Sequence, residues 1–427
     1  MPAQPFDYAP LLRPGLPPAA AKWSGFPKYN FVGGHNDGGS IPIEGLIQAA
    51  TSVLRREGRT LATYGLESGA QGYKPLREFV AAKLKADAGI ACTADEILIT
   101  SGSLQGLDLV NQLLLKPGDT VIGEEMTYGG ALTRVKKCGA TWLGAPVDSG
   151  GIRMDLLAQS LEDLKKRGIT PRYIYTIPTV QNPTATVMDE ARRAELLRLS
   201  EAYGVPIFED ECYADLTWSG KRPPAIRAMA GNDRVIHIGS FSKSIAPAIR
   251  LGYLVANWPL MSRILALKTD GGTPAIDQMV MAEFCAGHSD GKSDGQTGGK
   301  SGSRFDTHVV GLRKVLKRKL DVLVEALQAE FGTSAEFEMP DGGIFLWVKL
   351  PDGVDTMRLF QAAGKEGVAI NPGVEWSSNA EAGKTRLRLC FANSSEEQLR
   401  QGVAKLAEVC HREFGVPLRG RNTGRVG

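Results

Sequence analysis

The sequence predicts an α/β fold: a large domain with a mainly parallel seven-stranded sheet covered by helices, followed by a smaller α+β domain. The first observation behind this prediction is that short apolar runs alternate with longer helix-like stretches from about residue 45 to 285. Such alternation is typical of a parallel sheet covered on both faces. The second is the length of 427 residues, which exceeds one ordinary hydrophobic core and favours two domains.

Seven short apolar segments are the strand candidates of the large domain. Helix-like stretches at 104–115 and 189–203 lie between some of them. Ligands of such sheets bind beyond the carboxyl ends of the strands, so residues with useful chemistry should directly follow the strand segments. The segments are 96–100, 120–123, 141–147, 172–177, 205–209, 235–239 and 252–256.

The chain divides into three predicted parts: an N-terminal arm at 1–45, the large domain at 46–300 and the small domain at 301–427. Residues 287–302 hold six glycines and no apolar side chain, which predicts a flexible loop. The small domain is expected to contain a helix over about 312–327, strands near 344–349, 368–370 and 385–390, and a last helix over about 396–413.

Composition excludes several classes of function. A formal net charge of +3 favours neither a nucleic-acid nor a membrane partner. No apolar run approaches the roughly 18 residues of a membrane helix, and the first residues lack the profile of a signal peptide. The six cysteines are scattered without metal-ligand spacing, so we expect no metal site and reduced thiols in a cytoplasmic protein.

The most informative segment follows the strand candidate 235–239 and reads SFSKSIAPAIR. Its lysine, Lys243, can condense with an aldehyde, and Ser240, Ser242 and Arg250 can bind an anionic group beside it. Pyridoxal phosphate (PLP) carries both an aldehyde and a phosphate, so the segment predicts this cofactor. The alternative is an ordinary surface lysine, because the chain contains 50 lysines and arginines.

Two further strand ends carry residues suited to the same cofactor. Ser103 and Leu104 open a helix after the strand candidate 96–100. Free N–H groups at a helix start suit a phosphate, although serine and glycine there are often plain helix caps. Tyr128 follows the next strand candidate, where it could stack on a planar ring, although a core or rim tyrosine is the default.

The next two strand ends carry an amide and an acid. Asn182 lies between two prolines that could aim its side chain, with simple turn chemistry as the alternative. Asp210 ends a buried strand candidate three residues before Tyr213. A buried acid needs a cation, and the protonated pyridine nitrogen of PLP is one. A metal-binding acidic cluster is the weaker alternative, because no histidine lies near.

Together these motifs closely resemble those of PLP-dependent aminotransferases of fold type I. The nearest group is the class I/II branch that contains aminoadipate- and aromatic-type transaminases, and the resemblance covers about residues 30–410. It implies the PLP fold type I architecture. It also implies reversible amino transfer between an L-amino acid and a 2-oxo acid by a ping-pong route.

The resemblance also implies roles for the residues. Lys243 would bind the cofactor as a Schiff base and move a proton at the substrate Cα. Asp210 would pair with the pyridine nitrogen, and Tyr128 would stack on the ring. Asn182 and Tyr213 would bind the phenolic oxygen. The phosphate would be bound by Ser103, the Leu104 amide, Ser240, Ser242 and Arg250.

Two more matches concern the partner subunit and the substrate. Tyr64 resembles a tyrosine that crosses a dimer interface to the same phosphate, which implies a homodimer. Arg388 aligns with the arginine that binds the substrate α-carboxylate, and a planar guanidinium suits a planar carboxylate. Asn182 is a second candidate for binding the substrate. Taken alone, Arg388 is as well explained as an exposed strand arginine.

The chain departs from the family pattern mainly on the substrate side. The glycine pair at 33–34 precedes His35-Asn36-Asp37, where relatives carry a proline-containing phrase, in a segment that covers the substrate. Gly34 and His35 are therefore candidate substrate contacts, although His35 is equally explained as a loop histidine. Ala185 stands where the family has glycine, which is tolerable unless the backbone there needs a positive φ.

Two alternatives remain open at this stage. The same cofactor machinery could serve a lyase, decarboxylase or cyclase, and the sequence names no amino donor. A transcription regulator with an aminotransferase-like domain would need a DNA-binding module ahead of it, where this sequence offers only a proline-rich arm. A nucleotide-binding Rossmann protein is a poorer choice, because no Gly-x-Gly-x-x-Gly turn follows the first strand candidate.

Overall fold

The large sheet of the computed structural model has seven strands in the order β2-β10-β9-β8-β7-β3-β4. Neighbouring strands are parallel except at β10, which is antiparallel to both β2 and β9. The predicted mainly parallel seven-stranded sheet is therefore confirmed. The structure describes residues 6–16, 19–231, 233–287 and 303–418. The strands are β2 (Ile97–Ser101), β3 (Thr120–Glu124), β4 (Thr141–Ala145), β7 (Ile174–Thr176), β8 (Ile207–Asp210), β9 (Val235–Ser240) and β10 (Leu251–Val255).

Three predicted strands of the large sheet are shorter than expected. The segment 172–177 is a strand only over Ile174–Thr176, and the segment 205–209 becomes a strand only from Ile207. The segment 141–147 leaves the sheet after Ala145, because Pro146 has no N–H to continue the ladder. The residues after it form β5 (Val147–Asp148), which pairs with β6 (Gly151–Ile152) in a separate two-stranded sheet.

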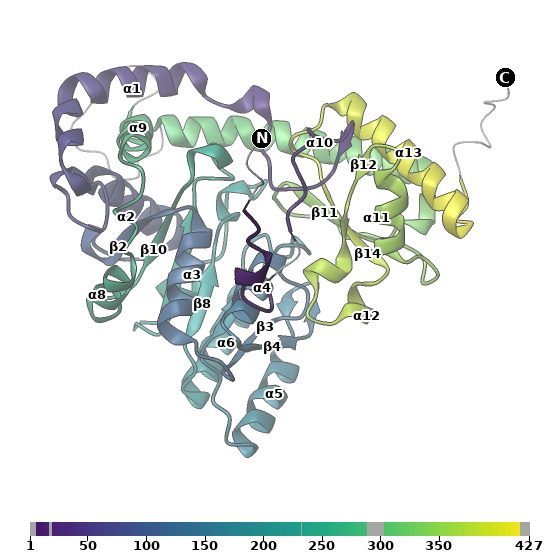
Figure 1. Ribbon diagram of the computed structural model, residues 1–427, viewed down its shortest axis with the longest axis horizontal. Coiled ribbons are helices and arrows are strands. Elements are labelled where there is room, and N and C mark those ends of the chain that lie inside the picture. The colour runs from purple at the N-terminus through teal and green to yellow at the C-terminus, as the bar shows by residue number, and fades with distance from the viewer. Residues whose placement is uncertain (1–5, 17–18, 232, 288–302, 419–427) are drawn as a thin grey trace.

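Successive strand residues alternate between two apolar layers, one on each face of the sheet, as the pleat requires. In β2, Leu98 packs with α3, α4 and α8, whereas Ile97 and Ile99 pack with α1, α2 and α9. Farther along, Ile174 and Ile207 face α5 and α6. Figure 1 shows these helices around the sheet. Their bounds are α1 (Ile43–Glu57), α2 (Lys74–Ala88), α3 (Ser103–Leu114), α4 (Gly129–Lys137), α5 (Met154–Lys166), α6 (Glu190–Tyr203), α7 (Ile226–Met229), α8 (Trp258–Leu267) and α9 (Ala275–Ala286).

A second core lies around a three-stranded antiparallel sheet in the order β11-β14-β13. Helix α10 contacts α9 and packs along α13, so it connects the two halves of the molecule (Figure 1). The elements are β11 (Phe345–Lys349), β13 (Asn371–Pro372), β14 (Arg386–Cys390), α10 (Arg304–Glu330), α11 (Thr356–Gly364), α12 (Ala380–Gly383) and α13 (Glu396–Phe414).

The N-terminal segment pairs with this second unit. The strand expected near 368–370 is β12 (Val368–Ala369), and it pairs in parallel with β1 (Tyr29–Asn30) instead of joining the three-stranded sheet. The division of the chain into three parts stays a prediction. The loop predicted at 287–302 falls outside the described residues apart from Gly287. No helix in the described part of the chain is long and apolar enough to span a bilayer.

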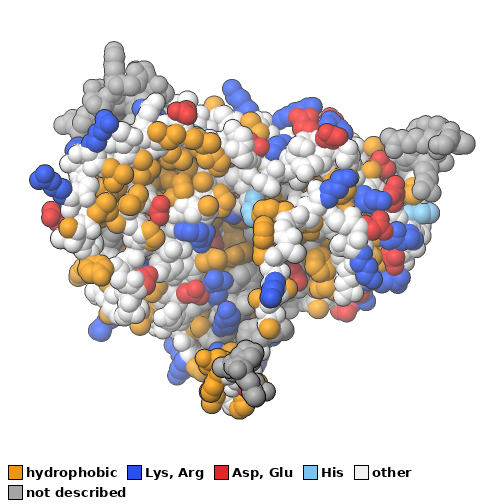
Figure 2. Space-filling view, turned by 45° about the horizontal axis from the view of Figure 1, so that its top comes forward, with side chains coloured by type: hydrophobic (Ala, Val, Ile, Leu, Met, Phe, Trp, Pro, Cys, Tyr) orange, Lys and Arg blue, Asp and Glu red, His pale blue; other side chains and the backbone are white. Residues whose placement is uncertain are grey.

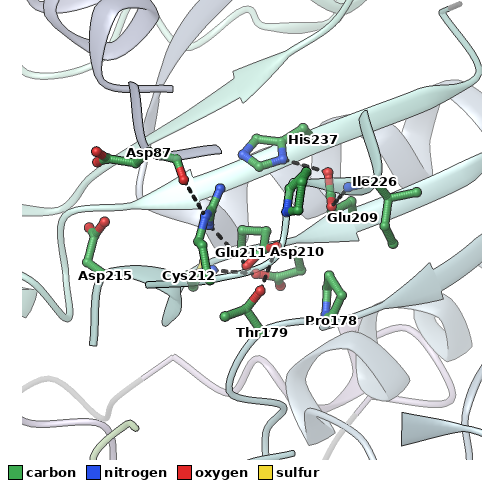
Figure 3. A network of polar contacts seen from close by, with 12 residues as sticks. Asp87, Pro178, Thr179, Glu209, Asp210, Glu211, Cys212, Asp215, Ile226 and His237 are labelled. Atoms are coloured by element: carbon green, nitrogen blue, oxygen red, sulfur yellow. Dashed lines mark hydrogen bonds and ion pairs between the residues drawn. The ribbon is translucent and has the colours of Figure 1, made fainter. Parts of the chain in front are cut away.

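A buried polar network lies beneath the carboxyl end of β8 (Figure 3). Arg193 of α6 is fully buried and donates to the Pro178 carbonyl at 3.0 Å and the Thr179 hydroxyl at 2.8 Å. Its Nη1 lies 3.4 Å from Glu211 Oε1, and Thr179 donates to that same oxygen at 2.9 Å. Burial raises the pKa of the Glu211 carboxyl, while Arg222 and Arg193 oppose the rise. The network thus holds the 178–179 segment against β8.

Replacing Arg193 by methionine should lower the free energy of unfolding by about 3–5 kcal/mol, because it leaves the Glu211 charge buried with too few partners. The measurement is the denaturant midpoint. The matched control is Arg198→Met on the same helix, whose ion pair with Glu195 is exposed. Its midpoint should stay unchanged, and equal losses in the two variants would contradict the prediction.

Candidate active site

A cavity of about 710 Å³ lies beyond the carboxyl ends of the parallel strands and reaches Arg388 of the smaller sheet. Its wall contains every predicted site residue except Tyr64 and His35. The predicted residues that line it are Gly34, Ser103, Leu104, Tyr128, Asn182, Asp210, Tyr213, Ser240, Ser242, Lys243, Arg250 and Arg388.

Lys243 lies just beyond β9, and its amine points at the N-terminal glycine pair. Its Nζ donates to the Gly34 carbonyl oxygen at 2.7 Å. Burial lowers the pKa of the Lys243 amine, while Cys390 and Cys212 nearby oppose the shift. A lower pKa increases the fraction of neutral amine, which is the nucleophilic form that condenses with an aldehyde.

Asp210 is the last residue of β8 and is only 4% exposed. Its Oδ2 accepts from the Tyr175 hydroxyl at 2.7 Å, and its Oδ1 accepts from the Cys212 N–H at 3.2 Å. Burial raises the pKa of the Asp210 carboxyl, and these hydrogen bonds oppose the rise. A cation in the cavity would stabilise the carboxylate.

Asn182 joins the two halves of the site. Its amide Nδ2 donates to the Tyr213 hydroxyl oxygen at 3.2 Å, and its Oδ1 accepts from Arg388 Nη1 at 3.0 Å. Arg388 Nη2 donates to the Gly33 carbonyl at 3.0 Å. The guanidinium carbon also lies 3.6 Å from the centre of the Trp376 ring, within cation–π range.

The charge of Arg388 is not neutralised by these neutral partners. Burial lowers the pKa of its guanidinium, and its buried Nε has no hydrogen-bond partner within the described residues. A carboxylate entering the cavity would supply both a charge and acceptors.

The opposite end of the cavity offers donors for an anion. Helix α3 begins at Ser103, so the N–H groups of Ser103 and Leu104 lie in its first turn, where the helix dipole is positive. Arg250 donates to the carbonyl oxygens of Pro247 at 3.3 Å and Ser101 at 3.4 Å. These are neutral acceptors, so the guanidinium can still bind a phosphate.

Three residues near the site have a left-handed backbone that side chains with a Cβ disfavour: Val180 (φ 55°), Ala185 (φ 60°) and Arg250 (φ 57°). The alanine that replaces the family's glycine therefore does occupy a positive-φ position. Strain was expected at Ala185 only if its backbone has a positive φ, and it does. Such conformations persist only where the surroundings hold them, and they cluster at functional sites.

The other two predicted site residues are not among the residues that line this cavity. Tyr64 is 95% exposed and lines a different surface hollow with Lys268 and Gln278. The His35 ring packs edge-on against Phe26 at 5.2 Å between centroids. Burial lowers the pKa of His35, and the nearby Lys243 charge adds to this. Its proposed substrate contact stays a prediction.

Sequence reasoning missed Trp376 in the cavity wall and Glu124, which contacts the lining residue Ile177. Trp376 could not be identified from the sequence, because its role comes from stacking on Arg388. Glu124 ends β3 and is 1% exposed, and burial raises the pKa of its carboxyl to about 7. A buried acid at a strand end was the signal that identified Asp210, and the same signal was available for Glu124.

Comparison with known proteins shows the class. The family model described as aminotransferase class I and II matches residues 28–406, and the chain belongs to this family. An aromatic-amino-acid aminotransferase of Thermococcus litoralis is 31% identical over 377 residues, 88% of this chain and 86% of the relative. The crystal structure of the α-aminoadipate aminotransferase of Thermus thermophilus, solved with N-(5′-phosphopyridoxyl)-L-leucine, superposes with a TM-score of 0.79. It is 31% identical and covers 91% of this chain and 93% of its own.

The chain is therefore a PLP-dependent transaminase of fold type I, in the aminoadipate and aromatic branch, and ping-pong transfer is general to its family. A helix-turn-helix regulator of Bacillus subtilis, YdfD, is also similar, with 33% identity over 83% of this chain but only 69% of its own length. The cavity fits PLP on its own chemistry. It combines a lysine with a lowered pKa, a buried acid and a helix start within one volume.

We expect Gly102→Ala to weaken cofactor binding. Gly102 has φ 74° and ψ 166°, a combination that is essentially restricted to glycine. A Cβ there would clash with Arg250 Nη2. Strain of about 1–3 kcal/mol concentrated at the phosphate end should weaken PLP binding about tenfold or more in an absorbance titration.

The control for this variant is Gly118→Ala. Gly118 has φ 88°, but a Cβ there meets nothing within 4 Å. It should lose stability without losing PLP affinity. If the two variants bind PLP equally well, Gly102 does not set the position of Arg250.

Proposed function

We propose that Lys243 binds the aldehyde carbon of PLP and, once free, moves the proton at the substrate Cα. PLP supplies an electrophilic aldehyde and a ring that takes up electrons from the substrate. Asp210 would keep the pyridine nitrogen protonated, and Tyr128 would stack on the ring. Asn182 and Tyr213 would bind the phenolic oxygen. The phosphate would be bound by Ser103, the Leu104 amide, Ser240, Ser242 and Arg250.

One observation carries this proposal: the Lys243 amine and the Arg388 guanidinium donate to the carbonyl oxygens of neighbouring residues, Gly34 and Gly33. Both groups therefore contact the same Gly33–Gly34 segment, and the Arg388 charge is close enough to help lower the pKa of the Lys243 amine. An α-amino acid whose carboxylate binds Arg388 would have its Cα close to Lys243. Effective catalysis requires this proximity between proton and base.

We propose an L-amino acid and a 2-oxo acid as substrates, with aromatic amino acids and 2-aminoadipate as the first donors to test. The names of the similar aminotransferases support this choice. In a half-reaction, a transaminase converts its bound cofactor to the amine form and releases one 2-oxo acid per site. Ammonia release without that conversion would instead support a lyase.

We also propose a homodimer in which Tyr64 of the partner subunit reaches the phosphate. The side chains Ile43, Ile47 and Leu54 of α1 are exposed, as are Leu61 and Tyr64. Figure 2 shows hydrophobic side chains gathered in the upper left of the view, over the end that carries α1 and α9 in Figure 1. An exposed apolar area of this kind is typical of a subunit interface.

We place the enzyme in the cytoplasm. All six cysteines are free thiols, and Cys285, Cys390 and Cys410 are buried. Free buried thiols are typical of proteins from a reducing compartment. Fractionation of cells that express the untagged protein would test this.

Replacing Lys243 by alanine should abolish the half-reaction and the covalent attachment of PLP, because Lys243 is the proposed nucleophile and base. The half-reaction is followed by the absorbance of the bound cofactor with excess amino donor. Borohydride reduction followed by mass spectrometry identifies the attached lysine. Transaminase activity in Lys243→Ala equal to that of the wild type would refute the assignment.

Replacing Tyr64 by alanine should weaken PLP binding about tenfold, because a hydrogen bond to a charged phosphate contributes about 1.5–3 kcal/mol. The control is Tyr8→Ala, another exposed tyrosine, which should bind PLP like the wild type. Light scattering reports the oligomeric state. A monomer with full PLP affinity would rule out the shared site.

A further inference from the structure

Glu124 is a fully buried carboxyl that the proposed catalytic roles do not use. It is the last residue of β3, four positions before Tyr128, and its side chain points into the interior behind the cavity wall. An acid at such a position is expensive to keep unless several donors surround it.

Four donors from three segments surround this carboxyl. Its Oε1 accepts from the Thr176 hydroxyl at 2.7 Å and the Ile177 N–H at 2.8 Å, at the end of β7. Its Oε2 accepts from the Thr127 hydroxyl at 3.2 Å and from Gln181 Nε2 at 3.3 Å. The carboxyl therefore joins the segment before Tyr128 to the segment before Asn182.

Gln181 extends this connection into the Asn182 loop. Its Nε2 also donates to the Met126 carbonyl at 2.7 Å, and its Oε1 accepts from the Thr184 N–H at 2.8 Å and the Thr184 hydroxyl at 2.7 Å. Gln181 is 1% exposed, so these contacts are shielded from water. The loop on both sides of Asn182 is thus held through one amide that itself contacts Glu124.

A third connection reaches Arg388. The Thr127 N–H donates to the Trp376 carbonyl at 2.9 Å, and the Trp376 ring stacks on the Arg388 guanidinium. Met126 also pairs with Ser377 in an isolated β-bridge. Thr127, which Glu124 contacts, therefore also contacts the backbone of Trp376, the residue whose ring stacks on Arg388.

We propose that Glu124 is a positioning residue of the transaminase. It holds Tyr128, Asn182 and Arg388 in the correct positions relative to one another, and it acts on Arg388 through Thr127 and Trp376. It is not among the residues that line the cavity. This inference rests on the proposed roles of those three residues. A displacement of about 1 Å in such groups can slow a reaction by up to about a hundredfold.

The experiment is Glu124→Gln, which keeps the shape of the side chain. Its amide oxygen can still accept from Thr176 and Ile177, but its NH₂ would face the Gln181 amide donor, so the Gln181 contact is lost. We expect PLP to bind at one per site, with a shifted absorbance maximum because Asn182 contacts the phenolic oxygen. For the amino donor, KM should rise and kcat/KM should fall about tenfold or more.

The matched control is Tyr173→Phe. It removes a buried hydrogen bond of 2.6 Å from the Tyr173 hydroxyl to Asn111, next to β7 but away from the cavity wall. This variant should lose stability while it keeps the wild-type KM, kcat and cofactor spectrum. If Glu124→Gln behaves in the same way, Glu124 is merely structural and the inference is overturned.

A second variant covers the case in which Glu124→Gln does not fold. Gln181→Met removes the amide that donates to Glu124 and introduces no new buried charge. It should raise KM and shift the cofactor spectrum in the same direction as Glu124→Gln. Wild-type kinetics and spectrum in Gln181→Met would overturn the inference. If the wild-type protein itself gives no half-reaction, the proposed function fails, which is a separate result.

Discussion

The site depends on one constraint: parallel strands all end at the same edge of the sheet. β2, β3, β7, β8 and β9 run in one direction, and each is followed by a residue of the cavity wall. β10 runs the opposite way, so its amino end lies at this edge. This explains why Lys243 and Arg250 share one short connection: the lysine follows β9 and the arginine precedes β10.

Burial of charge explains why these residues form a binding site and not only a structural core. The pKa values of Lys243 and Arg388 are lowered and that of Asp210 is raised, each mainly by burial. Each shift favours the neutral form of the group. A ligand that brings a pyridinium to Asp210 and a carboxylate to Arg388 would stabilise the charged forms, so binding would supply electrostatic stabilisation that the protein alone lacks.

Local patterns explain what could be predicted from the sequence. Lys243, Asp210 and Ser103 lie at the ends of strands with clear apolar patterns. The sheet and most of the cavity wall could therefore be predicted from the sequence. The pairing of β1 with β12 joins residues far apart in the chain, and the stacking of Trp376 on Arg388 joins two different elements. No local pattern encodes such contacts. The positive φ at Ala185 was also hidden, because alanine normally avoids that conformation.

The loop that carries Asn182 shows how the fold maintains an unfavourable backbone at the site. Val180 and Ala185 both have positive φ, and such strain persists only if the surroundings over-determine the loop. Arg193 binds the loop from one side through the Pro178 carbonyl and the Thr179 hydroxyl. Glu124 holds it from the other side through Gln181. The buried Arg193 guanidinium and the buried Glu124 carboxyl thus hold the segment that leads into Asn182, and Asn182 itself contacts Tyr213 and Arg388.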